Sequence, residues 1–235
     1  IVSLTAFDLA TGSITDSACI LAPIGNVLVS GDHLFLTGAS VTSEVSVNPS
    51  YPPFATNIHK LSASSNGNIT YLATGIVAGT LGRGNSSLDE HNGYFRIVTT
   101  QTKERNDRDN KLFILRQNDA LLEVIAQLPN TNQPITLGDV PNSHVSSIEY
   151  TNDKAFVSTY DRQNSTNPTD PLYTIDLTDP FSPTIEGRQE ISGTSGLLVP
   201  INNNWLLSIG RQVEDGQEQG FKLELFDVSQ ATPAS

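Results

Sequence analysis

Hydrophobic and polar residues alternate along this chain in short runs, and clusters of Gly, Asn, Asp, Pro and Ser separate the runs. Alternation with a period of two over four to eight residues is typical of a β-strand that buries one face. No segment of ten or more residues has the helical period of 3.6 residues. The pattern therefore predicts an all-β protein.

The predicted strands fall into groups of four. The three complete groups lie at residues 26–30, 33–39, 57–63 and 69–76; at 86–90, 94–100, 111–116 and 121–128; and at 145–150, 154–160, 172–177 and 184–191. A fourth group has three strands, at 196–201, 205–210 and 221–228. Two further strands, at 1–9 and 17–22, precede the first group.

Each group repeats the same order of turns and loops. A tight polar turn joins the first two strands, at Gly31-Asp32, Asn92-Gly93, Asn152-Asp153 and Asn202-Asn203. Such residues tolerate the positive φ of a two-residue hairpin. A long polar loop then precedes the third strand, at 40–56, 101–110, 161–171 and 212–220. Four-stranded antiparallel sheets that repeat in this way are blades of a β-propeller. A sandwich would explain the strand density, but not the shared turn and loop positions.

The repeat predicts one β-propeller domain over residues 1–235. Complete blades are expected at 23–80, 81–133 and 140–192, with partial blades at 1–22 and 193–235. The total of about 17 strands is not a multiple of the four that a blade requires. We therefore expect the chain to be a piece of a longer propeller, or to be completed by another segment.

Composition narrows the classes of partner and the location. The net charge of −12 argues against nucleic acid and against an anionic membrane surface, because both attract Lys and Arg. No run approaches the roughly 20 apolar residues of a membrane helix, so no membrane insertion is expected. The single cysteine, Cys19, excludes an intrachain disulfide and is interpreted as a small core residue. Few lysines, many Asn, Ser and Thr, and a start at Ile1 consistent with a removed export signal favour a secreted or cell-surface protein.

Four ordered motifs resemble a known family. They are TNIHKL at 56–61 with YLATG at 71–75, SLDEHNGYFRIVTT at 87–100, DPLYTIDLTDP at 170–180, and LELFDVS at 223–229. Together they resemble the bacterial and archaeal secreted proteins that carry a C-terminal β-propeller distantly related to WD40 repeats. The resemblance implies export and a propeller, and it implies no enzyme activity. Val98 stands where the family usually has alanine, which affects packing alone.

Asp89 and Glu90 lie beside the Asn92-Gly93 turn, and Arg96 lies just across it. One interpretation is a charged cluster at the rim of the propeller that binds a cation or a polar ligand. The other is an ion pair with hydrogen bonds that fixes the hairpin within one blade. The sequence favours the structural interpretation and leaves the binding role open.

Other acidic residues lie at turns and in a polar loop. Asp170 precedes Pro171, where its carboxylate is suited to accept backbone N–H groups. The segment 106–110 (NDRDN) is rich in the oxygen ligands of Ca²⁺, but Lys111 and Leu112 break the EF-hand pattern, so a solvated loop is favoured. No histidine pair has zinc-binding spacing. No cofactor is evident from the sequence.

The function favoured by the sequence is a non-enzymatic binding or scaffold module. Propellers present loops at either end of a central channel, and such surfaces commonly carry recognition. Tyr51 and Phe54, in the loop 40–56, form an apolar patch suited to a protein or carbohydrate partner. The alternative is a hydrolase or metal-dependent site, which requires Asp89, Glu90 and Asp170 to converge at one channel mouth.

Overall fold

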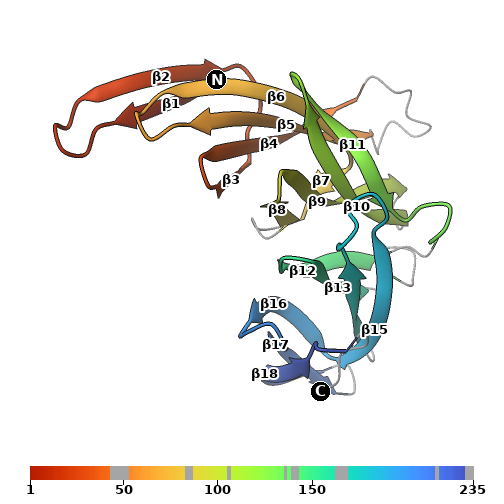
Figure 1. Cartoon of the computed structure of the whole chain (residues 1–235). Helices are drawn as coiled ribbons and strands as arrows, with labels where there is room; N and C mark the ends of the chain where they lie inside the picture. Colours follow the sequence, from red (N-terminus) through yellow and green to blue (C-terminus); the bar gives the residue numbers. More distant parts are fainter. Residues whose placement is uncertain are drawn as a thin grey trace.

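The protein is an open arc of antiparallel sheets (Figure 1). The computed structural model describes residues 1–42, 53–82, 87–104, 107–134, 137–138, 143–161, 169–214 and 217–230. The N-terminal hairpin lies at one end of the arc and the last three strands lie at the other (Figure 1). Among the described residues, no helix is long and apolar enough to cross a membrane.

The first part of the chain forms a hairpin and one four-stranded sheet. The N-terminal hairpin consists of β1 (Val2–Phe7) and β2 (Ile14–Ile20). The first blade pairs its strands in sequence order, as β3 (Asn26–Ser30), β4 (His33–Val41), β5 (Phe54–Ala63) and β6 (Ile69–Ala78). Ile20 and Leu4 of the hairpin pack on Leu36 and Leu61 of this blade.

The second blade has a divided inner strand. Both β7 (Thr80–Leu81) and β8 (Leu88–His91) pair with β9 (Tyr94–Glu104), and β10 (Asp107–Asn118) and β11 (Leu121–Leu128) complete the sheet. One parallel bridge, from Leu121 to Thr74 on β6, joins the second blade to the first. The N–H of Thr74 also donates to the carbonyl of Ala120 at 3.0 Å. The two blades therefore share one nine-stranded sheet.

The remaining strands form two separate sheets. The third blade contains β12 (Ser143–Tyr150), β13 (Lys154–Asp161), β14 (Thr169–Asp176) and β15 (Thr184–Ser192). The C-terminal sheet contains β16 (Thr194–Pro200), β17 (Trp205–Glu214) and β18 (Gln217–Asp227). All pairings within these two sheets are antiparallel. The prediction of an all-β propeller with four-stranded antiparallel blades is confirmed.

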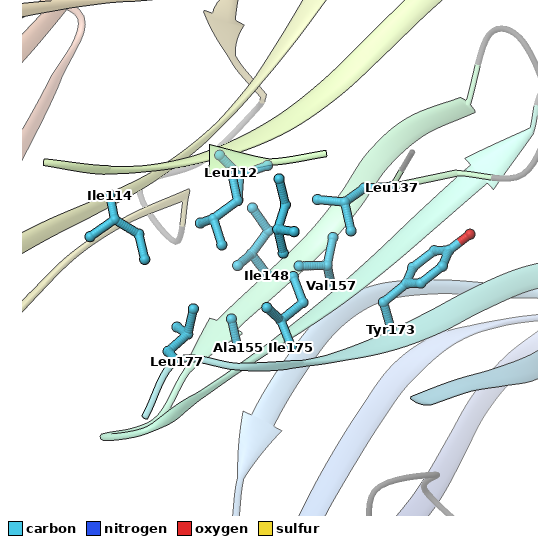
Figure 2. Close-up of a cluster of buried hydrophobic side chains, with 11 residues drawn as sticks. Leu112, Ile114, Leu137, Ile148, Ala155, Val157, Tyr173, Ile175 and Leu177 are labelled. Carbon is cyan, nitrogen blue, oxygen red and sulfur yellow. The ribbon is translucent and has the colours of Figure 1, made fainter. Parts of the chain in front are cut away.

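The core consists of clusters between neighbouring sheets. One cluster lies between the second and third blades and includes Leu112 and Ile114 of β10 with Val157 and Ile175 of the third blade (Figure 2). A second cluster lies between the first two blades, where the rings of Phe35 and Phe95 stack with their centres 4.5 Å apart. A third joins the third blade to the C-terminal sheet. Because each sheet packs face to face on the next, the corresponding ends of neighbouring blades lie next to each other.

Two segments predicted as long polar loops are largely strands. β9 and β10 pair as far as Glu104 and Asp107, and β17 and β18 pair as far as Glu214 and Gln217. The prediction was wrong because the polar composition of these segments was taken to indicate loops. The backbone hydrogen bonds of a hairpin need no apolar side chain, so a hairpin that projects beyond the core stays polar.

Cys19 is exposed, which corrects the prediction of a core residue. Its neighbour Ile20 faces the first blade, so the alternation of a strand turns Cys19 to the opposite face of the hairpin. There its sulfur lies 3.5 Å from the Ser3 hydroxyl. The outer face of the C-terminal sheet is also open, since Phe221 and Leu223 on β18 are 89% and 69% exposed.

Candidate functional site at the turn end of the blades

Side-chain contacts bring the tight turns of the three blades close together. We call this end of the blades, with the turns at residues 31–32, 92–93 and 152–153, the turn end. The loop end is the opposite end, where β4, β9 and β13 finish. Asn92 and Gly93 have φ values of 53° and 83°, the left-handed conformation predicted from the Asn-Gly pair. The N–H of Gly93 donates to Glu90 Oε1 at 2.9 Å, which fixes this turn.

Arg96 is buried between the second and third blades. Its guanidinium pairs with the Asp89 carboxylate on the neighbouring strand. It also donates to the carbonyls of Asn152 at 2.8 Å and Thr151 at 3.2 Å, both in the turn of the third blade. Its charge lies 5.3 Å from the centre of the Tyr150 ring. With 4% of its surface exposed, Arg96 therefore joins two blades. The structural interpretation placed these contacts within one hairpin, and the structure extends them to the neighbouring blade.

Glu90 makes the equivalent connection to the first blade. The Ser30 hydroxyl donates to Glu90 Oε2 at 2.6 Å. Lys60 lies nearby with its ammonium 5.5 Å from the centre of the Phe35 ring. Burial lowers the pKa of Lys60, and the negative charge of Glu90 opposes that change. Asp89 and Glu90 thus use their carboxylates in contacts between and within blades.

Burial also changes the titration of two groups on β12. Burial raises the pKa of Glu149, and the nearby charge of Asp89 raises it further. Burial raises the pKa of Tyr150 and keeps its phenol neutral, against the smaller effect of Arg96. The Tyr150 hydroxyl donates to the carbonyl of Ser87 at 3.4 Å, a further contact between the second and third blades. The junction is therefore a buried polar network around one cation.

A pocket of about 260 Å³, the turn-end pocket, opens beside this network. Tyr94 and Phe181 meet edge to face in it with ring centres 6.1 Å apart, and the Arg116 guanidinium lies 5.6 Å from the Phe181 ring. The wall is completed by residues from several turns and strands, namely His91, Asn92, Arg96, Ile114, Asp153, Leu177, Thr178, Asp179 and Pro180. The aromatic rings provide apolar area, and the polar side chains around them provide hydrogen-bonding groups.

Sequence reasoning missed Tyr94, Asp153 and Phe181 as neighbours in one pocket. They come from three segments, and the inter-blade packing that brings these segments together has no local sequence signal. The only available signal was the repeated turn position, which places Tyr94 and Asp153 at the same end of successive blades.

Asp170 lies at the loop end, away from Asp89 and Glu90. It pairs with Ile191 near the start of β14, whereas Asp176 at the other end of the same strand pairs with Lys154 beside the turn of the third blade. Six residues of strand separate Asp170 from Asp176, which corresponds to about 20 Å. The three acidic residues therefore do not converge at one end of the blades.

Phe54, another predicted residue, also lies toward the loop end. Phe54 is partly exposed at the start of β5 and lines a hollow of about 190 Å³. Tyr51 lies outside the described residues. In the oxygen-rich segment, Asn110 bonds to the carbonyls of Leu137 and Ser143, and Asn106 lies outside the described residues. Within the part of the chain that the structure describes, no group of three or more His, Cys, Asp or Glu side chains is placed to hold a metal ion.

Repeated four-stranded sheets packed face to face, with their tight turns at one end, define the chain as a β-propeller. The model of the family described as the β-propeller domain matches residues 1–234, and the chain belongs to this family. An uncharacterized protein of Methanocaldococcus jannaschii is 33% identical over 147 residues, and one of Archaeoglobus fulgidus is 34% identical over 146 residues. Each match covers 62% of this chain, but only 20% and 19% of the relatives' own lengths.

Two solved structures are also similar to this chain. The N-terminal domain of Nup159 aligns with 94% of the chain and 49% of its own length, at a TM-score of 0.48 and 9% identity. Hsv2 of Kluyveromyces marxianus aligns with 96% of the chain and 72% of its own length, at a TM-score of 0.37 and 8% identity.

Proposed function

We propose that this chain is a non-enzymatic binding or scaffold module that contacts a partner protein at its turn end. The observation that carries the proposal is the turn-end pocket, in which Tyr94 and Phe181 lie among polar side chains of neighbouring turns. Its volume of about 260 Å³ is below the roughly 300–1,000 Å³ of small-molecule sites. Such a pocket suits one anchoring side chain of a partner, the usual centre of a protein interface.

Hydrolysis is the weaker candidate. A glycosidase needs two carboxylates that face each other across the substrate, within about 10 Å. Here Asp89 is paired with Arg96, and Glu90 holds Ser30 and the N–H of Gly93. Asp170 is about 20 Å of strand away from the turn of its own blade. These contacts support structural roles for the carboxylates and favour binding over catalysis.

We also propose that the module works within a longer exported or cell-surface polypeptide. Three observations support this part of the proposal. The matched segment is about a fifth of the length of the archaeal relatives. The outer face of the C-terminal sheet carries exposed Leu197, Phe221 and Leu223, a surface suited to a further sheet. The acidic, lysine-poor composition supports an exported location.

Ligand selection tests the binding role. A peptide display library and an array of oligosaccharides are applied to the wild-type chain, to Phe181→Ala, and to the control Phe221→Ala, which is exposed on the C-terminal sheet. We expect peptides that are retained by the wild type and the control but lost by Phe181→Ala. Selection of oligosaccharides alone would assign a carbohydrate partner instead. Peptides that bind Phe181→Ala as well as the wild type would refute the turn-end site.

A further inference from the structure

A second pocket, of about 450 Å³, lies between the second and third blades at the loop end. We call it the loop-end pocket. Its wall is built from β7, the end of β9, the start of β10, the start of β12 and the end of β13, and it includes Thr80, Leu81, Thr102, Arg108, Val145 and Tyr160. The buried cluster of Figure 2 lies between the same two blades, and Val145 packs against it. The volume falls within the range of small-molecule sites.

A buried hydrogen-bond network holds the wall of this pocket in place. Asn110 has only 1% of its surface exposed. Its side-chain oxygen accepts from the Thr100 hydroxyl at 2.6 Å. Its side-chain nitrogen donates to the carbonyls of Leu137 at 2.7 Å and Ser143 at 3.1 Å. One amide therefore ties β9 and β10 to the residue before His144. A wall fixed in this way lowers the entropic cost of ordering the site around a ligand.

The chemistry of the wall suits an anion that also carries hydroxyl groups. Arg108 supplies a permanent positive charge and several N–H donors, so it can engage a ligand together with a protein partner. The hydroxyls of Thr80, Thr102 and Tyr160 have no hydrogen-bond partner within the described residues. Ser146 donates to Ser158, which leaves its oxygen able to accept. Among the lining residues that the structure describes there is no Asp or Glu, in a protein with a net charge of −12.

We propose that the loop-end pocket binds a sugar that carries one carboxylate, as in a hexuronate. The planar guanidinium of Arg108 matches a carboxylate with two parallel hydrogen bonds. The hydroxyls of Thr80, Thr102 and Tyr160 match the hydroxyls of the sugar ring, and Leu81 and Val145 offer apolar contact to its C–H groups. Arg108 is the one arginine among the described lining residues, and within a strongly acidic protein it favours one ligand charge over the two of a phosphate.

This site is separate from the one proposed for the partner protein. The two pockets lie at opposite ends of the same pair of blades and have no described lining residue in common. A variant that loses binding at one pocket therefore still allows binding at the other pocket to be measured. Failure of the sugar proposal does not bear on the turn-end site, and failure of the turn-end site does not bear on the sugar.

The test is an NMR titration of the isotope-labelled chain with sodium D-glucuronate. D-glucose serves as the neutral match, and inorganic phosphate and sulfate serve as simple anions. We expect glucuronate to shift resonances of the loop-end pocket and to bind at least about tenfold more tightly than glucose. A tetrasaccharide that ends in a uronate distinguishes a free sugar from a polysaccharide end. Tighter binding of the tetrasaccharide would assign the polymer, and equal binding would assign the free acid.

Variants connect the signal to the pocket. Arg108→Gln is expected to weaken glucuronate binding about tenfold and to leave glucose binding unchanged, because it removes the charge and keeps a polar side chain. Tyr160→Phe removes one hydroxyl and is expected to weaken both sugars several-fold, which provides a second measurement if Arg108→Gln unfolds. Arg211→Gln is the control, since Arg211 is exposed on β17 and pairs with Glu218.

Three results would overturn the proposal. The first is the absence of shifts with glucuronate up to roughly 50 mM, well beyond millimolar affinity. The second is equal binding of phosphate or sulfate and glucuronate, which would show a general oxyanion site. The third is unchanged glucuronate binding in folded Arg108→Gln or Tyr160→Phe.

Discussion

Replacement of Arg96 by methionine tests how the second and third blades are held together. Methionine replaces the aliphatic stem of arginine and carries no charge, so Arg96→Met removes the partner of Asp89 and the donors to the carbonyls of Thr151 and Asn152. Removal of one partner from a fully buried ion pair costs about 3–5 kcal/mol. The Asp89 side chain is 27% exposed, so water hydrates it in part and the pair contributes near the lower limit.

We therefore expect Arg96→Met to lower the free energy of unfolding by about 3 kcal/mol, including the loss of hydrogen bonds to the two carbonyls. The measurement is urea denaturation followed by far-UV circular dichroism, with the slope compared between variants to check that the same surface unfolds. Arg211→Met is the matched control. Its pair with Glu218 is more than half exposed on both sides, and the expected change is below about 1 kcal/mol.

A second substitution separates the unpaired charge from lost packing. Asp89→Asn in the Arg96→Met background removes the carboxylate charge that the first change leaves without a partner. We expect the double variant to be more stable than the sum of the two single variants predicts. The reasoning is refuted if Arg96→Met costs no more than Arg211→Met, or if the two changes at Asp89 and Arg96 are additive.

Three further predictions concern other parts of the fold. Gly38→Ala should destabilise the first blade by about 1–3 kcal/mol in urea denaturation, because its new Cβ would lie 1.7 Å from the Pro23 carbonyl oxygen, whereas Gly25→Ala, with 4.0 Å of space, should cost less. Backbone N–H groups at the start of β6 and on β2 lower the pKa of Asp16. The ionised Asp16 carboxylate therefore stabilises the folded protein at pH values above its ordinary pKa of 3.8, and this contribution is lost as the pH falls through the lower pKa of the folded state. Asp16→Asn should remove this component from the pH dependence of the urea midpoint. Leu223→Lys should change the unfolding free energy by less than about 0.5 kcal/mol in urea denaturation, since Leu223 is 69% exposed; a larger loss would show that the side chain packs within the folded chain.

The local pattern predicts the blades but not the limits of their strands. The Asn92-Gly93 turn follows from residue chemistry, because both positions need a positive φ that Asn and Gly accept. The sequence does not predict the projecting hairpin of β9 and β10. Backbone pairing stabilises this hairpin, and its polar side chains do not show the alternation that indicates a strand. Cys19 shows a related limit, since the sequence does not state which face of an outer hairpin another sheet covers.

The candidate site was predictable only within one hairpin. Asp89, Glu90 and Arg96 are close in sequence, so their ion pair was foreseen as one of two interpretations. Their contacts with Ser30 and with the turn at 151–152 span more than 50 residues and depend on how the sheets stack. The loop-end pocket has the same origin, because its wall combines β7, β9, β10, β12 and β13.

The bridge between β6 and β11 makes the junction of the first two blades harder to separate than the later junctions of the arc. Backbone hydrogen bonds run through the first two blades as one sheet, whereas the second and third blades belong to separate sheets and meet through side chains such as those of Arg96 and Asn110. Under mechanical tension, we expect the sheets to separate between β11 and β12, or between β15 and β16, before the first two blades separate from each other. Amide hydrogen exchange should accordingly report β3–β11 opening as one cooperative unit, with the separate sheets β12–β15 and β16–β18 opening at other rates.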